Sequence, residues 1–191
     1  MATAWHETGR FKWLKEIWGP TAAQKRYEGR ADLGNTVAGD GFKFLGRGLA
    51  HITGRRNYTD WSRRLGIDLV KEPQLAEELP IAARILVEGM VKGTFTGKKL
   101  QDYINSDQCD YVEARRIVNG KDKAALIAGY AEKFEAALIG RSASPSPSPA
   151  PKPSTPPAGG SSTSPAAAIV AVLLAIAGGV YAFLKSQGIL P

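Results

Sequence analysis

Two glutamates near the start of the chain, Glu7 and Glu16, have the side chains needed to hydrolyse a glycosidic bond. In that reaction one carboxyl group protonates the leaving oxygen, and a second carboxylate activates water. On one continuous helix, residues nine apart would lie on opposite faces, roughly 13 Å apart along the axis. The chain must therefore turn between them. We predict that a helix carrying Glu7 ends at Thr8-Gly9, with Gly9 as its C-cap.

The composition limits the class of protein. The chain has 191 residues, 43% of them hydrophobic, which is enough for one domain with a core and additional segments. All 18 acidic residues precede position 141, so residues 1–140 have 22 basic and 18 acidic groups, a net charge of +4. That small excess suits a protein near an anionic cell surface, and we predict no nucleic-acid partner. One cysteine, Cys109, and two histidines argue against a disulfide framework or a metal site, and we predict no cofactor.

Composition also divides the chain into parts. We predict a globular domain over residues 1–140, a Pro/Ser-rich linker over 141–165, a transmembrane helix over 166–184 and a short tail over 185–191. Alternating Ser and Pro in the linker prevent helix formation and cannot bury a core. The N-terminal sequence MATAWHETG has the wrong length and order of residues for a secretory signal, so it predicts no export route.

The segment 166–184 has no charged residue, and its 19 residues suit a bilayer. At about 1.5 Å per residue a helix of this length spans ~28 Å, close to the thickness of the hydrocarbon core. Tyr181 and Lys185 fit the interfacial region at one end, and a spacing of four between small residues from Ala171 to Gly179 permits self-association. The alternative is a buried helix that packs back on the domain, but no equally apolar groove is evident in the sequence.

The periodicity of apolar residues predicts a mainly α domain. We expect one or two short amphipathic helical turns at Phe11 to Trp18, stopped by Gly19-Pro20. Helices are expected from Thr59-Asp60 onward, at Pro80 to Val91, after the capping pair Asp110 and Glu113, and from Asp122 onward. Glycines recur from 29 to 54, too often for a regular helix. They predict a long loop or a small hairpin region, which is the usual place for binding residues.

Several motifs occur in order along this domain. HETG at 6–9 is followed nine residues after its Glu by a second Glu, and then by YEGR at 27–30, GDG at 39–41, GRGLAHITGRRNY at 46–58 and IVNGKDKAALIAGYAEKF at 117–134. Together they resemble the catalytic domain of glycoside hydrolase family 19 over residues 5–139. The likeness is closer to phage endolysins that cut peptidoglycan than to plant chitinases. It implies a mainly α, lysozyme-like domain with a cleft, in which two carboxylates hydrolyse the bond with inversion.

The resemblance implies a role for several residues. Glu7 falls on the general acid and Glu16 on the second carboxylate, which activates water. Thr53 falls on a hydroxyl residue that helps to hold this water, and Asn57 on a substrate-binding asparagine. His51 stands where the family has a glutamine that contacts sugar amide groups, so we expect an altered sugar subsite.

Chemistry adds a requirement and leaves alternatives open. A general acid must be protonated near neutral pH, which needs an apolar setting such as Trp5 and Phe11 could offer Glu7. Glu16 must stay ionised, and the alternative for it is a solvated residue that pairs with Lys12 or Lys15.

Other candidates also have two interpretations. Glu28 is the rival second carboxylate, since plant-type relatives place this acid farther from the first, although YEGR looks more like a charged structural turn. Arg47 is expected either to support the carboxylates or to anchor the glycine loop. Trp13 and Trp18 are expected either to stack on sugar faces or to pack in the core.

The sequence thus predicts a membrane-anchored endolysin that hydrolyses β-1,4 bonds of peptidoglycan during phage or prophage lysis. Its expected partners are glycan strands and, through 166–184, the inner membrane of a bacterial host, with the catalytic domain in the periplasm. A chitinase is the first alternative. An inactive membrane-tethered wall-binding protein is the second, because family members have helices before the HE motif and only five residues precede His6 here.

Overall fold

The computed structural model describes residues 1–142. Residues 141 and 142, the first two of the predicted linker, are still helical. The rest of the predicted linker, the transmembrane helix and the tail lie outside the described residues and stay predictions. Within residues 1–142 the chain forms helices and loops, with three isolated antiparallel bridges and no β-strand, so the mainly α prediction is confirmed for this part. No helix in this range is both long and apolar enough to cross a bilayer.

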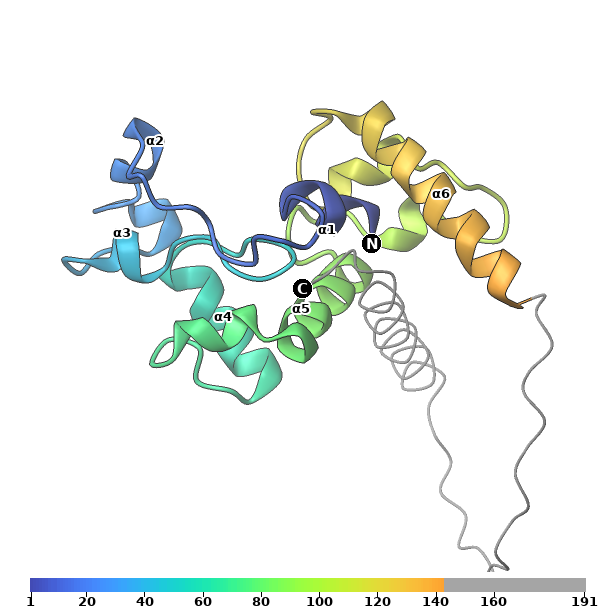
Figure 1. Ribbon diagram of the computed structural model, residues 1–191. Coiled ribbons are helices and arrows are strands. Elements are labelled where there is room, and N and C mark those ends of the chain that lie inside the picture. The colour runs from blue at the N-terminus through green and yellow to red at the C-terminus, as the bar shows by residue number, and fades with distance from the viewer. Residues whose placement is uncertain (143–191) are drawn as a thin grey trace, which may run out of the picture.

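Residues 1–142 form six α-helices and four short 3₁₀ helices. The α-helices are α1 (Ala2–Glu7), α2 (Ala22–Lys25), α3 (Asp40–Lys43), α4 (Arg55–Leu65), α5 (Leu79–Lys92) and α6 (Ala124–Ser142). The 3₁₀ helices are η1 (Ala31–Leu33), η2 (Pro73–Glu77), η3 (Leu100–Asp102) and η4 (Glu113–Ile117). Figure 1 shows α2, α3 and α4 on one side of α1 and α5, and α6 on the other.

Helix α5 contributes to both buried clusters of the described residues. Ile85 packs with Phe44, Tyr58 and other residues of the first cluster. Ala82 and Leu86 pack in the second cluster, which also holds Ala4 of α1 and Leu49 of the loop after α3. The loop that carries the candidate binding residues is therefore fixed to the same helix as the segment that carries Glu7.

The predicted helix boundaries are correct for α5 and approximate elsewhere. Proline in the first turn and the left-handed Gly93 (φ 70°) define the ends of α5. Helix α4 begins at Arg55, four residues earlier than predicted, because Gly54 (φ 89°) already turns the chain into it. Asp110 accepts a hydrogen bond from the Glu113 N–H at 2.9 Å as expected, but the segment that follows is the 3₁₀ helix η4.

The prediction of short helical turns from Phe11 to Trp18 is wrong. This stretch has no helix, and its backbone pairs instead with the loop at 46–48. The Glu16 N–H donates to the Gly46 carbonyl at 2.8 Å, and the Gly48 N–H donates to the Leu14 carbonyl at 2.7 Å. Pairing with a distant segment has satisfied backbone groups that a helix would have satisfied locally.

A buried ion pair fixes the loop before α4. Arg55 donates to both carboxylate oxygens of Asp40, whose side chain is only 2% exposed. These hydrogen bonds hold the pKa of Asp40 below its ordinary value of 3.8. The Asn35 side chain also accepts from the Arg55 N–H, at 2.8 Å. The start of α4 is therefore attached to the loop at two points.

We expect Asp40→Asn to lower the free energy of unfolding by about 2 kcal/mol at pH 7, since a charged hydrogen-bond partner is lost from a buried site. Because the folded-state pKa is lowered, the stabilisation is full above pH 3.8 and is lost as the pH falls through the folded-state pKa. Urea unfolding across this range measures the difference. Asp32→Asn, which breaks the exposed pair with Arg30, is the control and should change nothing measurable at either pH. An Asp40→Asn effect that persists undiminished at the lowest pH would contradict this account.

Candidate active site

A tight turn separates Glu7 from Glu16, as predicted. Thr8 caps α1, and its hydroxyl donates to the Ala4 carbonyl and accepts from the Phe11 N–H. Gly9 then adopts a left-handed conformation (φ 57°), and so do Arg10 and Phe11 (φ 66° and 64°). Left-handed backbone is unfavourable for residues with a Cβ, and such residues often mark functional sites. The sequence predicted the turn but not that two non-glycine residues would take part in it.

Three donors hold the carboxylate of Glu16. The Gln24 side chain donates to Oε1 at 2.9 Å, the Tyr27 hydroxyl donates to the same oxygen at 3.3 Å, and the Gly46 N–H donates to Oε2 at 3.0 Å. Burial and the neighbouring Glu16 charge raise the pKa of Tyr27, which keeps its hydroxyl protonated as a donor. No ion pair joins Glu16 to Lys12 or Lys15 in the described part of the chain. Glu16 is therefore oriented by its neighbours and is not a solvated surface residue.

Gly46 brings three predicted site residues to one place. A Cβ built at this glycine would lie 3.3 Å from each of Glu16 Oε2, His51 Cβ and Thr53 Oγ1. The Thr53 hydroxyl donates to the His51 carbonyl at 3.0 Å, so its oxygen can only accept further hydrogen bonds. The second carboxylate and the hydroxyl expected beside it thus lie around the same backbone position.

We expect Gly46→Ala to lower kcat/KM about tenfold, because an added methyl must displace Glu16 and Thr53 by a few tenths of an ångström. The backbone at Gly46 is not left-handed, so the thermal unfolding temperature should change little. Gly129→Ala is the matched control, because its methyl enters open space. Equal activity of the two variants would show that the space around Gly46 does not matter for catalysis.

The other predicted sugar contacts lie near this place. Trp13 is 45% exposed, which excludes a core-packing role for its ring, and Lys12 Nζ lies 4.7 Å from the ring centroid. The His51 ring nitrogen Nε2 lies 3.1 Å from the Trp13 carbonyl oxygen, and His51 itself is left-handed (φ 47°). Asn57 is exposed on α4, and its amide donates to the Thr53 carbonyl at 2.7 Å. Trp18 instead packs edge-on against the Phe42 ring.

Arg47 lies apart from the carboxylates. Its buried guanidinium donates to Glu77 at 2.8 Å, to the Lys43 carbonyl at 2.7 Å and to the Tyr58 hydroxyl at 3.0 Å. Within residues 1–142 it makes no hydrogen bond to Glu7 or Glu16. This placement favours the second interpretation of Arg47, in which it anchors the glycine loop.

Glu28 also has structural partners. Its two oxygens accept hydrogen bonds from the Gly39 and Gly41 N–H groups at 2.6 and 2.8 Å, so the carboxylate ties the YEGR turn to the GDG loop. This arrangement favours the structural interpretation of Glu28 and leaves Glu16 as the better candidate for the second carboxylate.

Glu7 does not have the apolar setting that we predicted. Trp5 and Phe11 pack edge-on against each other, and Trp5 also packs against Phe134 of α6. The Glu7 carboxylate forms an ion pair with Arg115 of η4, whose side chain is 2% exposed, against 27% for Glu7. One nitrogen of Arg115, Nη1, is buried and has no hydrogen-bond partner within the described residues. The prediction of an apolar environment for Glu7 is therefore wrong, and the Glu7 carboxylate lies instead beside the positive charge of Arg115.

Glu7 and Glu16 thus belong to two networks that share no hydrogen-bond partner among residues 1–142. The first joins α1 to η4, and the second joins the extended segment before α2 to the glycine loop. Sequence reasoning missed Gln24, Tyr27 and Arg115. The spacing of Thr21 and Gln24 is that of a capping box, which the structure confirms, and this signal could have located Gln24. Nothing local could have paired Arg115 with Glu7, since 108 positions separate them.

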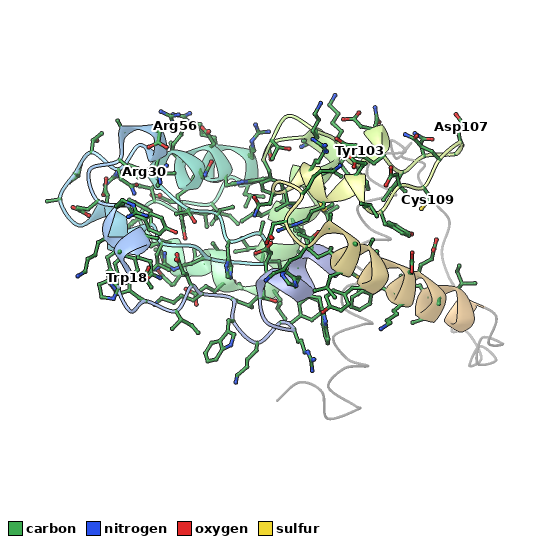
Figure 2. The ribbon with its side chains drawn as sticks, turned by 90° about the horizontal axis from the view of Figure 1, so that it is seen from above. Trp18, Arg30, Arg56, Tyr103, Asp107 and Cys109 are labelled. Carbon is green, nitrogen blue, oxygen red and sulfur yellow. The ribbon has the colours of Figure 1, made fainter. Side chains whose placement is uncertain are left out.

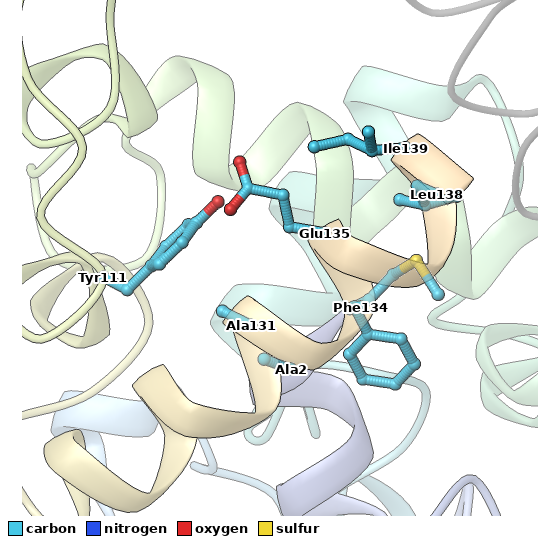
Figure 3. Close-up of a pocket in the computed structure, with 8 residues that line it drawn as sticks. Ala2, Tyr111, Ala131, Phe134, Glu135, Leu138 and Ile139 are labelled. Carbon is cyan, nitrogen blue, oxygen red and sulfur yellow. The ribbon is translucent and has the colours of Figure 1, made fainter. Parts of the chain in front are cut away.

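Two pockets of the described part lie beside Met1 and Ala2, and the smaller one is lined in part by Arg115, the partner of Glu7. A pocket of about 320 Å³ is lined by Met1, Ala2, Tyr111, Ala131, Phe134, Glu135, Leu138 and Ile139, most of which Figure 3 labels. Burial, with hydrogen bonding to Cys109 and Glu135, raises the pKa of Tyr111. None of the predicted site residues lines this pocket. No group of three or more potential metal ligands occurs within residues 1–142.

Comparison with known proteins gives partial support for the family resemblance. No family model matches the chain. A protein of Haemophilus influenzae, described as a glycosyl hydrolase family 19 domain-containing protein, is 37% identical over 65 residues. The match covers 34% of this chain and 32% of the relative, so the chain spans about a third of that protein's length. This similarity supports the family 19 resemblance over a part of the chain.

Proposed function

We propose that this protein hydrolyses β-1,4 glycosidic bonds of bacterial peptidoglycan with inversion, as an endolysin of a phage or prophage. The observation that carries the proposal is the Glu16 site, where three donors orient one carboxylate beside Thr53 and His51. An oriented carboxylate next to a hydroxyl is what a general base needs to position water. The similarity to a family 19 domain protein agrees with this chemistry.

Glu16 and Thr53 would together orient the attacking water. The Thr53 hydroxyl proton is already donated to the His51 carbonyl, so both Thr53 and the Glu16 carboxylate can only accept. A water between them would donate one hydrogen to each and direct a lone pair at the anomeric carbon. Proton transfer to Glu16 would accompany attack.

Glu7 would supply the proton to the leaving oxygen, although its ion pair with Arg115 replaces the apolar setting that we expected for a proton donor. One of its oxygens, Oε1, accepts from Arg115, and Oε2 has no partner among the described residues. Oε2 is thus the atom available to a sugar oxygen. Arg115 would fix the orientation of the carboxyl group, and a proton on Oε2 would be used in the reaction. Asn57, His51 and Trp13 would contact the sugars, and Arg47 would hold the loop beneath them.

We propose the inner membrane as the place of action, with residues 166–184 as a single C-terminal anchor and the domain in the periplasm. The Pro/Ser-rich linker would then reach up to ~70 Å at about 3.1 Å per residue. This distance lets an anchored domain contact the wall.

Digestion of purified peptidoglycan, followed by mass analysis of the products, tests the proposed activity. We expect new reducing ends and no new amino groups, and the mass of the end sugar tells muramidase from glucosaminidase cleavage. New amino groups alone would show an amidase or peptidase. Cleavage of chitin with intact walls would favour the chitinase alternative, and wall binding without any cleavage would favour the inactive one.

A further inference from the structure

The charge of the domain is divided unevenly along the chain. Residues 9–66 contain 12 lysines and arginines and five aspartates and glutamates, a net charge of +7. Residues 67–140 contain ten and twelve, a net charge of −2. The net positive charge of the domain therefore comes entirely from residues 9–66, which include the residues of the Glu16 site.

Every acidic side chain of residues 9–66 forms an ion pair or accepts hydrogen bonds. Three of the five form ion pairs with arginines of the same segment, in the pairs Asp32 with Arg30, Asp40 with Arg55, and Asp60 with Arg63. Glu16 and Glu28 accept the hydrogen bonds described above. The positive charge of the remaining side chains is therefore not neutralised from within the segment.

Eight cations of this segment have no ion-pair partner within residues 1–142, and all eight are exposed. We call them the free cations; they are Arg10, Lys12, Lys15, Lys25, Arg26, Lys43, Arg56 and Arg64. Figure 2 shows Arg56 at the end of the molecule that holds Trp18, opposite the end that holds Asp107. Among the free cations, Arg56 therefore lies at the end of the domain away from Asp107 (Figure 2).

Four of the free cations lie on the two segments that build the Glu16 site. Lys12 and Lys15 flank the exposed Trp13 on the extended segment before Glu16. The backbone of Lys15 forms an isolated antiparallel β-bridge with that of Arg47. Lys25 and Arg26 follow Gln24, which donates to Glu16. Both segments that hold the Glu16 carboxylate therefore carry exposed positive side chains close to it in the sequence.

We infer that the free cations bind the carboxylates of the peptide stems of peptidoglycan and hold the glycan strand against Glu16. Peptidoglycan carries such carboxylates, whereas chitin is uncharged. Exposed charges are screened beyond roughly 8 Å at physiological ionic strength, so several cations close to the strand are needed for a useful effect. The inference rests on the proposed function and selects an anionic glycan as its substrate class.

The test measures binding separately from cleavage. The full chain in non-ionic detergent is mixed with sacculi stripped of accessory polymers, with the same sacculi after amidation of their carboxyl groups, and with chitin, each at low and high salt. A triple variant, Lys15→Gln with Lys25→Gln and Arg26→Gln, is compared with a control triple, Lys71→Gln with Lys98→Gln and Lys133→Gln. The control removes the same charge from exposed, unpaired positions of the other segment.

At low salt, we expect the site triple to bind native sacculi about tenfold more weakly than the parent, and the control triple to bind within about twofold of it. Amidation of the sacculi or high salt should reduce parent binding to the level of the site triple. Equal losses in the two triples, or parent binding that amidation leaves unchanged, would overturn the inference. Cleavage is scored in the same tubes. If the parent binds in a carboxylate-dependent way but releases no new reducing ends, the proposed hydrolysis is refuted and the inference about binding still stands.

Discussion

Replacing Glu16 by glutamine is expected to lower kcat by about 10²- to 10⁴-fold, because an amide cannot accept the proton of the attacking water. The change in stability should be small, about 1 kcal/mol, since the amide oxygen can keep the bonds from Gln24 and Tyr27 while the amide nitrogen meets the Gly46 N–H. Initial rates of reducing-end release, with urea unfolding of the same preparation, measure the two effects.

Glu28→Gln is the matched control for this experiment. It makes the same chemical change in the rival carboxylate, whose oxygens accept from Gly39 and Gly41. We expect it to lose some stability and to keep most of its activity per folded molecule. The opposite pattern, an active Glu16→Gln protein and an inactive Glu28→Gln protein, would exchange the two assignments.

The second prediction with a large effect concerns the ion pair of Glu7 with Arg115. There, a second substitution should restore stability without restoring activity. Glu7→Gln leaves the 2% exposed Arg115 without a counter-charge, and we expect a loss of about 3 kcal/mol in the free energy of unfolding. Replacing a buried ion pair by neutral side chains is often nearly neutral. The double variant Glu7→Gln with Arg115→Met should therefore recover most of the lost stability, as urea unfolding would show.

Activity should not return with that stability. If Glu7 donates the proton, the double variant will be as inactive as Glu7→Gln although it is folded. A double variant with activity close to the parent would mean that Glu7 only joins α1 to η4. Arg115→Met alone is informative too, because it keeps the carboxyl group and removes what orients it, so kcat should fall with little change in KM.

Local patterns in the sequence predicted the long helices well. Apolar side chains at helical spacing, with Pro80 near the start and Gly93 after the end, determine α5, and a similar stripe through Ile127 and Phe134 determines most of α6. Gly9 correctly predicted the turn after Glu7. In these places nearby residues decide the conformation.

The errors came from contacts between distant segments. The stretch from Phe11 to Trp18 has a helical pattern but pairs its backbone with residues 46–48, at least thirty positions away. The Glu7 environment was predicted from its neighbours Trp5 and Phe11, yet its partner Arg115 comes from η4. Arg115 lies in a run with apolar residues that follows the capping pair Asp110 and Glu113, and no local feature shows that its side chain is buried.

The two-carboxylate mechanism is tested most directly by ¹H NMR of the first product released from a soluble peptidoglycan fragment. Direct attack by a water held at Glu16 inverts the anomeric carbon, so a β-1,4 bond should give the α-anomer first, and the β-anomer should appear later by mutarotation. Initial formation of the β-anomer would contradict the assignment of Glu16 as the base that activates water.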